Sequence, residues 1–304
     1  MRSLLFVPAD SEKKIPKALA SGADAVILDL EDSVSPANKI RARGIAAGIL
    51  KSAKLYVRIN ALETGLAGAD LAAILPAGPA GIMLPKSESA ATVNDLYRLM
   101  MSIGPFNGEL PVIAIATETA QSLFGLGTYR DAHPSLAALT WGMEDLATSL
   151  GATANRDGQG NPTEPFRLAR ALCLAGAKAA GVEAIDTVFT NFRDLAGFER
   201  EAVEAARDGF TGKLCIHPDQ VAVANAAFTP PPQAVARARR IVDAFAAAGN
   251  PGVISLDGAM LDVPHLRAAR ALLARADGVS PNSQRSTGPI LPSPLVGEGA
   301  KVER

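Results

Sequence analysis

The chain has 304 residues, a formal net charge of −1, 48% hydrophobic and 5% aromatic residues. This balance lacks the basic excess that binding to nucleic acid or to an anionic membrane requires, so we expect neither partner. No apolar run is long enough to span a bilayer, and no signal peptide is evident, so we expect a cytoplasmic protein, or one of an organelle matrix. Cys173 and Cys215 lack zinc spacing and are predicted to be buried hydrophobes in a reducing compartment.

Short apolar runs alternate along the chain with longer helical segments rich in Ala, Leu, Lys and Arg. This alternation is typical of βαβ units and a parallel sheet. The eight predicted strands are 3–7, 24–30, 54–60, 81–85, 111–117, 136–142, 184–190 and 213–218. Eight strands with eight crossovers predict an α/β protein with a closed (β/α)8 TIM barrel. A doubly wound sheet is less consistent with the first turn, VPADSEKK, which lacks GxGxxG.

The chain continues beyond the eighth predicted strand. TPPPQAVARARRIVDAFAAAG is expected to form a helix opened by prolines, ISLDGAMLDVP a turn or hairpin, and HLRAARALLARA a last helix. From about Val279 the composition changes to Ser, Pro, Gly and Asn, which predicts a disordered tail. We therefore expect a catalytic barrel at 1–229, a helical lid extension at 230–278 and a tail at 279–304.

Acidic residues and an arginine follow predicted strands two and three. Side chains alternate along a strand, so Asp29 and Glu31 share one face and Asp32 lies on the other. Neighbouring acids repel one another unless cations or donors compensate, and for Asp32 a helix N-cap is the alternative. Arg58 and Asn60 share a face, and an arginine at the end of a barrel strand suits a substrate carboxylate or phosphate. A salt bridge from Arg58 to the strand-two acids remains equally open.

Two further ionisable side chains follow strands four and eight. Lys86 can form a Schiff base, as in some aldolases, or act as a counter-ion for nearby acids. We favour the counter-ion because surrounding carboxylates keep a lysine protonated. His217 can act as a general base, but we expect it to hydrogen-bond within the rim of the barrel.

Carboxylates follow strands five and six, at Glu118 and Asp145. Adjacent strands lie about 4.8 Å apart, so two such carboxylates can reach a common ion. Two carboxylates with waters and substrate oxygens are the usual environment of Mg²⁺, and the lack of His and Cys partners argues against zinc. For Asp145, the N-cap of a helix beginning LATSLG is the alternative. The pair predicts a Mg²⁺ site, with Mn²⁺ as the other candidate ion.

Eight motifs follow one another in order from Arg2 to about Arg275. They are RSLLFVPA, DAVILDLEDSV, VRIN, GIMLPKSES, TETA, WGMEDLATSLGA, GFTGKLCIHPDQ and LDGAMLD. Together they resemble the citrate lyase β-subunit (CitE-like) family of the HpcH/HpaI aldolase–citrate lyase group, which includes malyl-CoA and citramalyl-CoA lyases. The sequence departs from that family at Ala259, where the lid motif usually has lysine, and at Asn191, where an acid is usual.

The resemblance implies a Mg²⁺-dependent carbon–carbon lyase that cleaves a 3-hydroxyacyl thioester such as citryl-, citramalyl- or malyl-CoA into a keto acid and an acetyl thioester. By motif position, Glu118 and Asp145 correspond to the metal ligands and Arg58 to the arginine that holds the substrate. Asp262 corresponds to the acid of a C-terminal lid, which in CoA-using relatives reaches a neighbouring subunit, and is the candidate general acid/base. Glu31 would orient water or Arg58. Substrate contacts are expected from Asp29, Arg58, Lys86, Gly142, Met143 and Glu144.

The resemblance also implies a homotrimer or hexamer, with a coenzyme A thioester as substrate. Three other functions remain open. The same site can run as a malate-synthase or malyl-CoA thioesterase, or the chain can be the β subunit of a citrate lyase complex that works on an acyl-carrier protein. The third is a barrel that has lost catalysis and only binds ligands.

Overall fold

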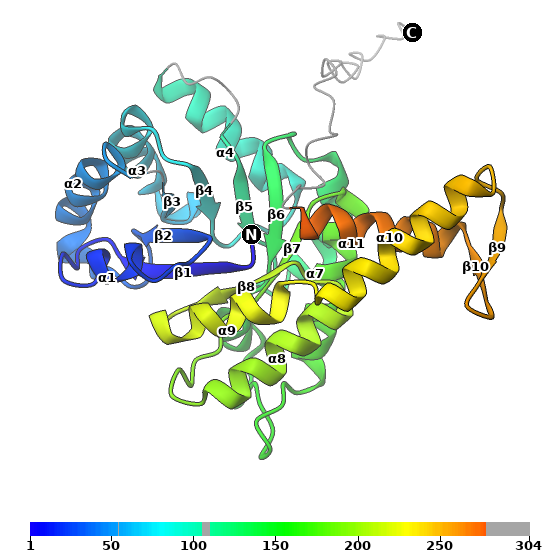
Figure 1. Ribbon diagram of the computed structural model, residues 1–304. Helices are drawn as coiled ribbons and strands as arrows, with labels where there is room; N and C mark the ends of the chain where they lie inside the picture. The colour runs from blue at the N-terminus through cyan, green and yellow to red at the C-terminus, as the bar shows by residue number, and fades with distance from the viewer. Residues whose placement is uncertain (54, 105–109, 278–304) are drawn as a thin grey trace, which may run out of the picture.

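In the computed structural model, which describes residues 1–53, 55–104 and 110–277, eight parallel strands close into a barrel (Figure 1). The strands are β1 (Ser3–Pro8), β2 (Ala25–Asp29), β3 (Tyr56–Arg58), β4 (Gly81–Leu84), β5 (Val112–Ile115), β6 (Leu136–Thr140), β7 (Glu183–Asp186) and β8 (Gly212–Cys215). Each overlaps one of the eight predicted runs, so the predicted (β/α)8 TIM barrel is confirmed. Closure follows from β1, which pairs with β2 on one side and with β8 on the other.

Helices cover the outside of the barrel, because parallel strands need a crossover that returns the chain to the same end. They are α1 (Ile15–Leu19), α2 (Lys39–Leu50), α3 (Ala67–Ile74), α4 (Ala90–Ile103), α5 (Ser122–Gly125), α6 (Met143–Leu150), α7 (Glu164–Ala180), α8 (Leu195–Asp208) and α9 (Pro218–Phe228). Short 3-10 turns supplement them at η1 (Pro36–Asn38), η2 (Leu62–Thr64), η3 (Leu75–Ala77) and η4 (Leu126–Asp131).

The alternation of side chains along each strand divides the core into two layers. One set fills the barrel interior, including Leu4, Ile27, Met83, Ile113 and Ile185. The other set points outward and packs against the helices in a much larger apolar layer. Cys173 and Cys215 are buried, as the sequence predicts. No helix within the described ranges is both long and apolar enough to cross a membrane.

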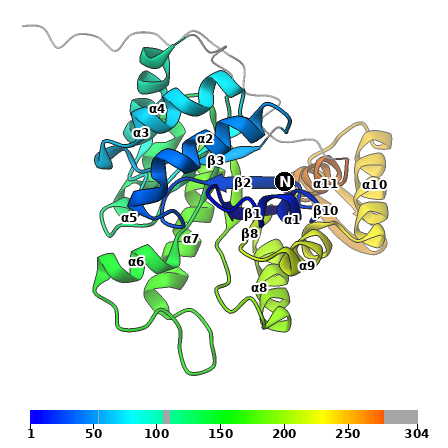
Figure 2. The same cartoon turned by 90° about the vertical axis from the view of Figure 1, so that its left-hand side faces the viewer.

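The C-terminal extension is a helical hairpin made of α10 (Pro232–Ala247), β9 (Val253–Leu256), β10 (Ala259–Asp262) and α11 (Val263–Ala276). β9 and β10 pair antiparallel, which is the hairpin that the sequence predicts. α10 and α11 pack on each other around a small core of their own, with Phe245 and Leu261 at its centre. Figure 2 shows α5 and α6 on one side of the barrel and α10 and α11 on the other.

The extension therefore leaves from the end of the barrel where the strands begin. The division into 1–229 and 230–278 stays a prediction, and the expected disordered tail at 279–304 lies outside the described residues.

Candidate active site at the carboxyl ends of the strands

A cavity of about 350 Å³ opens where the strands end, at the mouth of the barrel. Seven of the predicted site residues line it: Asp29, Arg58, Glu118, Gly142, Met143, Glu144 and Asp145. Its volume is within the range of small-ligand sites, and catalytic groups in this fold come from these strand ends. A second cavity, of about 470 Å³, adjoins it and shares Phe6, Lys14 and Ile216, with Lys17 further along its wall.

Arg58 is held by the strand-two acids across the mouth. Asp29 and Arg58 are partners in the register of β2 and β3, which is why their side chains meet. Arg58 Nε and Nη2 donate to Asp29 Oδ1 and Oδ2 at 2.7 and 2.6 Å, and Nη1 lies 3.0 Å from Glu31 Oε2. Phe6 lies against the guanidinium, 4.8 Å from its ring centroid. The salt bridge that the sequence left open is formed, and it fixes the guanidinium beside the cavity.

The two acids differ in their charge balance. Although burial works to raise it, the Arg58 guanidinium keeps the pKa of Asp29 below its usual range. Burial raises the pKa of Glu31 to about 7, although the positive charge of Arg58 works to lower it. The negative charge of Asp32 adds to the increase. Asp32 is exposed, and Ser35 rather than Asp32 precedes the 3-10 turn, so the N-cap alternative for Asp32 is wrong.

Lys86 connects the acids of the mouth through both its backbone and its side chain. It adopts a left-handed conformation, φ 49°, which is rare for a residue with a Cβ. Its N–H donates to Glu118 Oε2 at 2.5 Å, while Nζ lies 3.2 Å from Glu31 and 3.5 Å from Asp145. Burial alone would lower the pKa of Lys86, but Glu31, Glu118, Asp145 and Asp32 together raise it. A protonated Lys86 fits the counter-ion role better than a Schiff base.

Glu118 is buried at the end of β5 and faces other acids. Burial raises its pKa to about 8, and repulsion by Glu31 and Asp145 adds to this, despite the Lys86 N–H. Gly142 leaves the room that Glu118 occupies, because a Cβ at Gly142 would lie 2.6 Å from Glu118 Cγ. The glycine is thus required by the position of this carboxylate.

Asp145 lies in the first turn of α6. The helix begins at Met143 with Gly142 as its N-cap, so the alternative in which Asp145 caps a later helix is wrong. Its side chain is 38% exposed and points toward Lys86 in the same cavity as Glu118.

The donor set fits a hard divalent cation. Glu118 and Asp145 supply carboxylate oxygens from neighbouring strand ends, with only Lys86 and Arg58 to balance five nearby acids. In the described part of the chain, no group of three or more His, Cys, Asp or Glu side chains is arranged to hold a metal. Two carboxylates completed by waters and substrate oxygens are what Mg²⁺ accepts, whereas zinc would need more protein ligands.

A second group of interacting polar and charged side chains lies behind the mouth. It consists of Trp141, Arg170, Asp186 and Lys213 and is called the rear cluster. Their neighbours along the strands, such as Ile185, fill the barrel interior, so Asp186 and Lys213 point outward toward the helices. Trp141 Nε1 donates to Asp186 Oδ1 at 2.8 Å, and Lys213 Nζ lies 2.6 Å from Asp186 Oδ2. The rear cluster thereby holds the residue that precedes Gly142.

Two predicted residues lie elsewhere. Asn60 does not join Arg58: β3 ends at Arg58, and Asn60 instead donates to Asp70 Oδ2 from its backbone at 2.8 Å and its amide at 2.7 Å. Asp262, the last residue of β10, caps α11 together with His265 and is half-exposed. Figure 1 shows β10 on the extension, away from the barrel. His217 caps α9 by accepting a hydrogen bond from the Asp219 N–H, as expected for a residue that hydrogen-bonds within the rim. Its ring also stacks on Phe192.

The sequence reasoning missed Phe6, Lys14, Asp186 and Lys213. The alternation along β1 places Phe6 on the same face as the interior residue Leu4, which is a signal that could have found it. Asp186 and Lys213 are partners in the register of β7 and β8, so strand pairing was a signal for that pair, whereas the contact of Arg170 with Asp186 depends on how α7 packs.

Comparison with known proteins identifies the family. The profile of HpcH/HpaI aldolase/citrate lyase matches residues 2–218, and that of C-C_Bond_Lyase of the TIM-Barrel fold matches residues 168–279. This chain belongs to the HpcH/HpaI aldolase/citrate lyase family. Its enzyme class is accordingly that of a carbon–carbon lyase.

Individual relatives span almost the whole chain. It is 34% identical to a (3S)-malyl-CoA thioesterase of Cereibacter sphaeroides, covering 92% of this chain and 95% of the relative. It is 35% identical to a mitochondrial citramalyl-CoA lyase of Rattus norvegicus, with coverage of 91% and 86%. The crystal structure of CitE from Mycobacterium tuberculosis with magnesium, acetoacetate and coenzyme A superposes with a TM-score of 0.74 at 34% identity, covering 91% of this chain and 100% of CitE.

Proposed function

We propose that the chain cleaves a 3-hydroxyacyl-coenzyme A thioester, of the citramalyl-, malyl- or citryl-CoA type, into a keto acid and an acetyl thioester. The observation that carries the proposal is the juxtaposition of Arg58, fixed by Asp29, with the carboxylates Glu118 and Asp145 around one small cavity. A substrate with a carboxylate beside a hydroxyl matches this combination of a guanidinium and a cation site.

In the proposed reaction, a base removes the proton of the substrate hydroxyl and the bond between C2 and C3 breaks. The electron pair of that bond passes to C2 as a thioester enolate, the hydroxyl carbon becomes the carbonyl of the keto acid, and a proton returns to C2. Arg58 stabilises negative charge on a substrate oxygen, an effect of a few kcal/mol per donor in comparable sites. Its two-point contact with Asp29 keeps the guanidinium oriented.

Glu118 and Asp145 would hold Mg²⁺, or Mn²⁺ in its place. When bound, the ion supplies Lewis-acid polarisation and a template for the keto-acid half. Lys86 contacts both Glu118 and Asp145, and Glu31 contacts Arg58, so these two residues would keep the cation's carboxylates and the guanidinium in position. Support comes from CitE, which was crystallised with magnesium, acetoacetate and coenzyme A.

Asp262 remains our candidate general acid/base, and its position requires an oligomer. It lies on the extension that leaves from the opposite end of the barrel, so it can serve only the site of another copy of the chain. A homotrimer or hexamer in which each extension reaches the active-site mouth of a neighbouring subunit meets this requirement. The adjoining cavity, with Lys14 and Lys17 on its wall, would receive the phosphate-bearing thioester carrier.

A panel of citramalyl-, malyl- and citryl-CoA, incubated with the full chain and Mg²⁺ and analysed by mass spectrometry, tests the proposal. We expect one keto acid and acetyl-CoA in equal amounts, loss of both in EDTA, and loss of both in Glu118→Gln. Glu199→Gln, an exposed change on α8, is the matched control. Keto-acid release that persists in EDTA would refute the metal-dependent reaction.

A thioesterase is the second candidate, favoured by the similarity to (3S)-malyl-CoA thioesterase. It would release free coenzyme A and malate without any keto acid. The same panel separates the two outcomes. Activity only on an acyl-carrier-protein thioester would instead favour the β subunit of a citrate lyase complex.

A further inference from the structure

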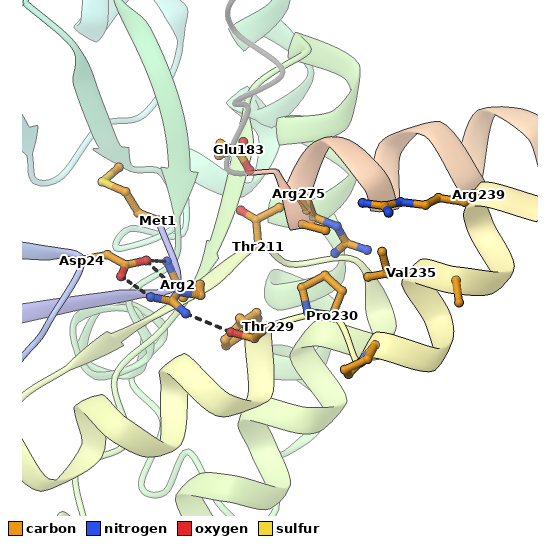
Figure 3. A pocket seen from close by; sticks show the side chains of 14 residues that line it. Met1, Arg2, Asp24, Glu183, Thr211, Thr229, Pro230, Val235, Arg239 and Arg275 are labelled. Carbon is orange, nitrogen blue, oxygen red and sulfur yellow. Dashed lines mark hydrogen bonds and ion pairs between the residues drawn. The ribbon is translucent and has the colours of Figure 1, made fainter. Parts of the chain in front are cut away.

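A larger cavity, of about 810 Å³, lies at the other end of the molecule from the proposed active site. The starts of the strands and the end of α9 form one wall, and α10 and α11 form the other (Figure 3). Its apolar lining comes from Met1, Phe228, Pro230, Pro232 and Val235. Nothing in the proposed reaction uses this space.

One arginine of this cavity is already neutralised. Arg2 donates to Asp24 from its backbone at 2.7 Å and from its guanidinium at 3.0 and 2.7 Å, and its Nη1 donates to Thr229 at 2.9 Å. The hydrogen bonds from Arg2 hold the pKa of Asp24 below its usual range. This pair ties β1 to the approach to β2 and leaves no charge for a ligand.

Two other arginines present uncompensated charge. Arg239 comes from α10 and Arg275 from α11. Figure 3 shows both guanidinium groups pointing into the space between the helices and the starts of the strands. Across residues 1–53, 55–104 and 110–277, neither has an ion pair or side-chain hydrogen bond. Arg275 also repels the charge of Lys178, and burial together with this repulsion lowers the pKa of that lysine. Glu183, an acid that also lines the cavity, has the opposite effect on Lys178 and works to raise its pKa.

Arg239 and Arg275, from two helices, bring two positive charges to one cavity, and an anion placed between them relieves their repulsion. Guanidinium groups favour phosphate and carboxylate oxygens, which they bind in two-point contacts. The apolar residues of the lining, which come from both walls, suit a ligand that carries a hydrophobic portion beside its charged group. The volume is within the range of sites for small molecules.

We propose that this cavity is a second binding site, for an amphiphilic phosphate ester whose phosphate contacts Arg239 and Arg275. Its apolar portion lies against Phe228, Pro230 and Val235. The site is separate from Glu118 and Asp145, so binding does not need the metal. It joins the extension to the barrel, because α10 and α11 supply one side and the strand starts the other.

Isothermal titration of the full-length protein in EDTA with octyl phosphate, and separately with pyrophosphate, tests the proposal. We expect one saturable octyl phosphate site per chain, at least tenfold tighter than that for pyrophosphate. Arg239→Gln with Arg275→Gln should weaken octyl phosphate at least tenfold, and Arg239→Glu should abolish binding. Arg237→Gln, an exposed change on the same helix outside the cavity, should leave the affinity unchanged.

Equal affinity of the wild type and the double glutamine variant would overturn the assignment of the phosphate to these arginines, as would an absence of saturable binding. Equal affinity for octyl phosphate and pyrophosphate would overturn the role of the apolar lining. All three arginines are exposed, so circular dichroism should show the variants folded. Cleavage activity of the double variant should remain that of the wild type.

Discussion

Two groups of charged side chains, one at the mouth of the barrel and one behind it, differ in how fully their charges are compensated. The mouth cluster, Asp29, Glu31, Arg58, Lys86 and Glu118, contains more acids than cations. Burial raises the pKa of Glu31 to about 7 and that of Glu118 to about 8.

In the rear cluster, burial also acts on Asp186, but Lys213, Arg170 and the indole of Trp141 hold its pKa below the usual range. A buried carboxylate that is fully paired contributes to the fold, whereas carboxylates in excess of their partners mark a place prepared for a cation.

The largest expected effect comes from the rear cluster. Lys213→Met leaves Asp186 with less compensation for its buried charge, and removing one partner of a buried pair costs about 3–5 kcal/mol of unfolding free energy. Glu118→Gln replaces a carboxyl group whose charged form is already disfavoured by burial, and should change stability by less than about 1 kcal/mol. Urea denaturation measures both.

Lys51→Met, on the exposed surface, is the control and should stay within about 0.5 kcal/mol of the wild type. If Lys213→Met and Glu118→Gln lose the same amount of stability, the two clusters do not differ in the way described here.

The next largest effect is on catalysis, through Gly142. A methyl group at Gly142→Ala would meet Glu118 Cγ at 2.6 Å and displace the carboxylate. Misplacement of about 1 Å can cost about 100-fold in rate, so kcat/KM should fall by roughly 10- to 100-fold with a higher Mg²⁺ requirement. Gly44→Ala, on α2 with open space around its Cβ, should keep full activity. An unchanged Mg²⁺ requirement in Gly142→Ala would contradict this account.

A smaller effect should appear in the pH dependence of stability. Because the folded-state pKa of Asp186 lies below its unfolded value of about 3.9, this carboxylate stabilises the fold above that pH. That contribution is lost as the pH falls below about 4 toward the folded-state pKa. Between pH 5 and pH 2, the unfolding free energy of the wild type should therefore fall more steeply than that of Asp186→Asn. Parallel slopes would show that Asp186 is not stabilised as an anion.

The smallest effect should be spectroscopic. Trp141 is the single tryptophan of the sequence, hydrogen-bonded to the rear cluster and adjacent to Gly142. Mg²⁺ binding at Glu118 should therefore shift its emission modestly in the wild type. The shift should be absent in Glu118→Gln and present in Glu199→Gln. A shift that survives in Glu118→Gln would mean that the tryptophan senses another event.

Much of the barrel could be predicted because the strand pattern is local. Apolar runs with alternating side chains fix both the strand order and the meeting of Asp29 with Arg58, which are register partners. The prediction for Asn60 was wrong because alternation ceases where β3 ends, and Asp70 on α3 offers it two acceptor contacts.

Other parts of the site depend on contacts between distant segments. Gly142 and Lys86 were expected to contact substrate, but the space that Gly142 leaves for Glu118 and the left-handed backbone of Lys86 are features that no local sequence pattern reports. Asp262 belongs to the extension, so the catalytic part proposed for it would require a second copy of the chain. In the rear cluster, Asp186 and Lys213 are register partners of β7 and β8, so strand pairing could have found them. The contact of Arg170 from α7 with Asp186 arises from helix packing, which no local pattern reports.

The central claim is that Glu118 and Asp145 together hold a divalent cation at the mouth. Equilibrium binding of Mn²⁺, measured by electron paramagnetic resonance on metal-free protein, tests it most directly. We predict one Mn²⁺ per chain in the wild type, displaced by Mg²⁺, and its loss in both Glu118→Gln and Asp145→Asn but not in Glu199→Gln. Mn²⁺ binding of wild-type affinity in either site variant would contradict the claim.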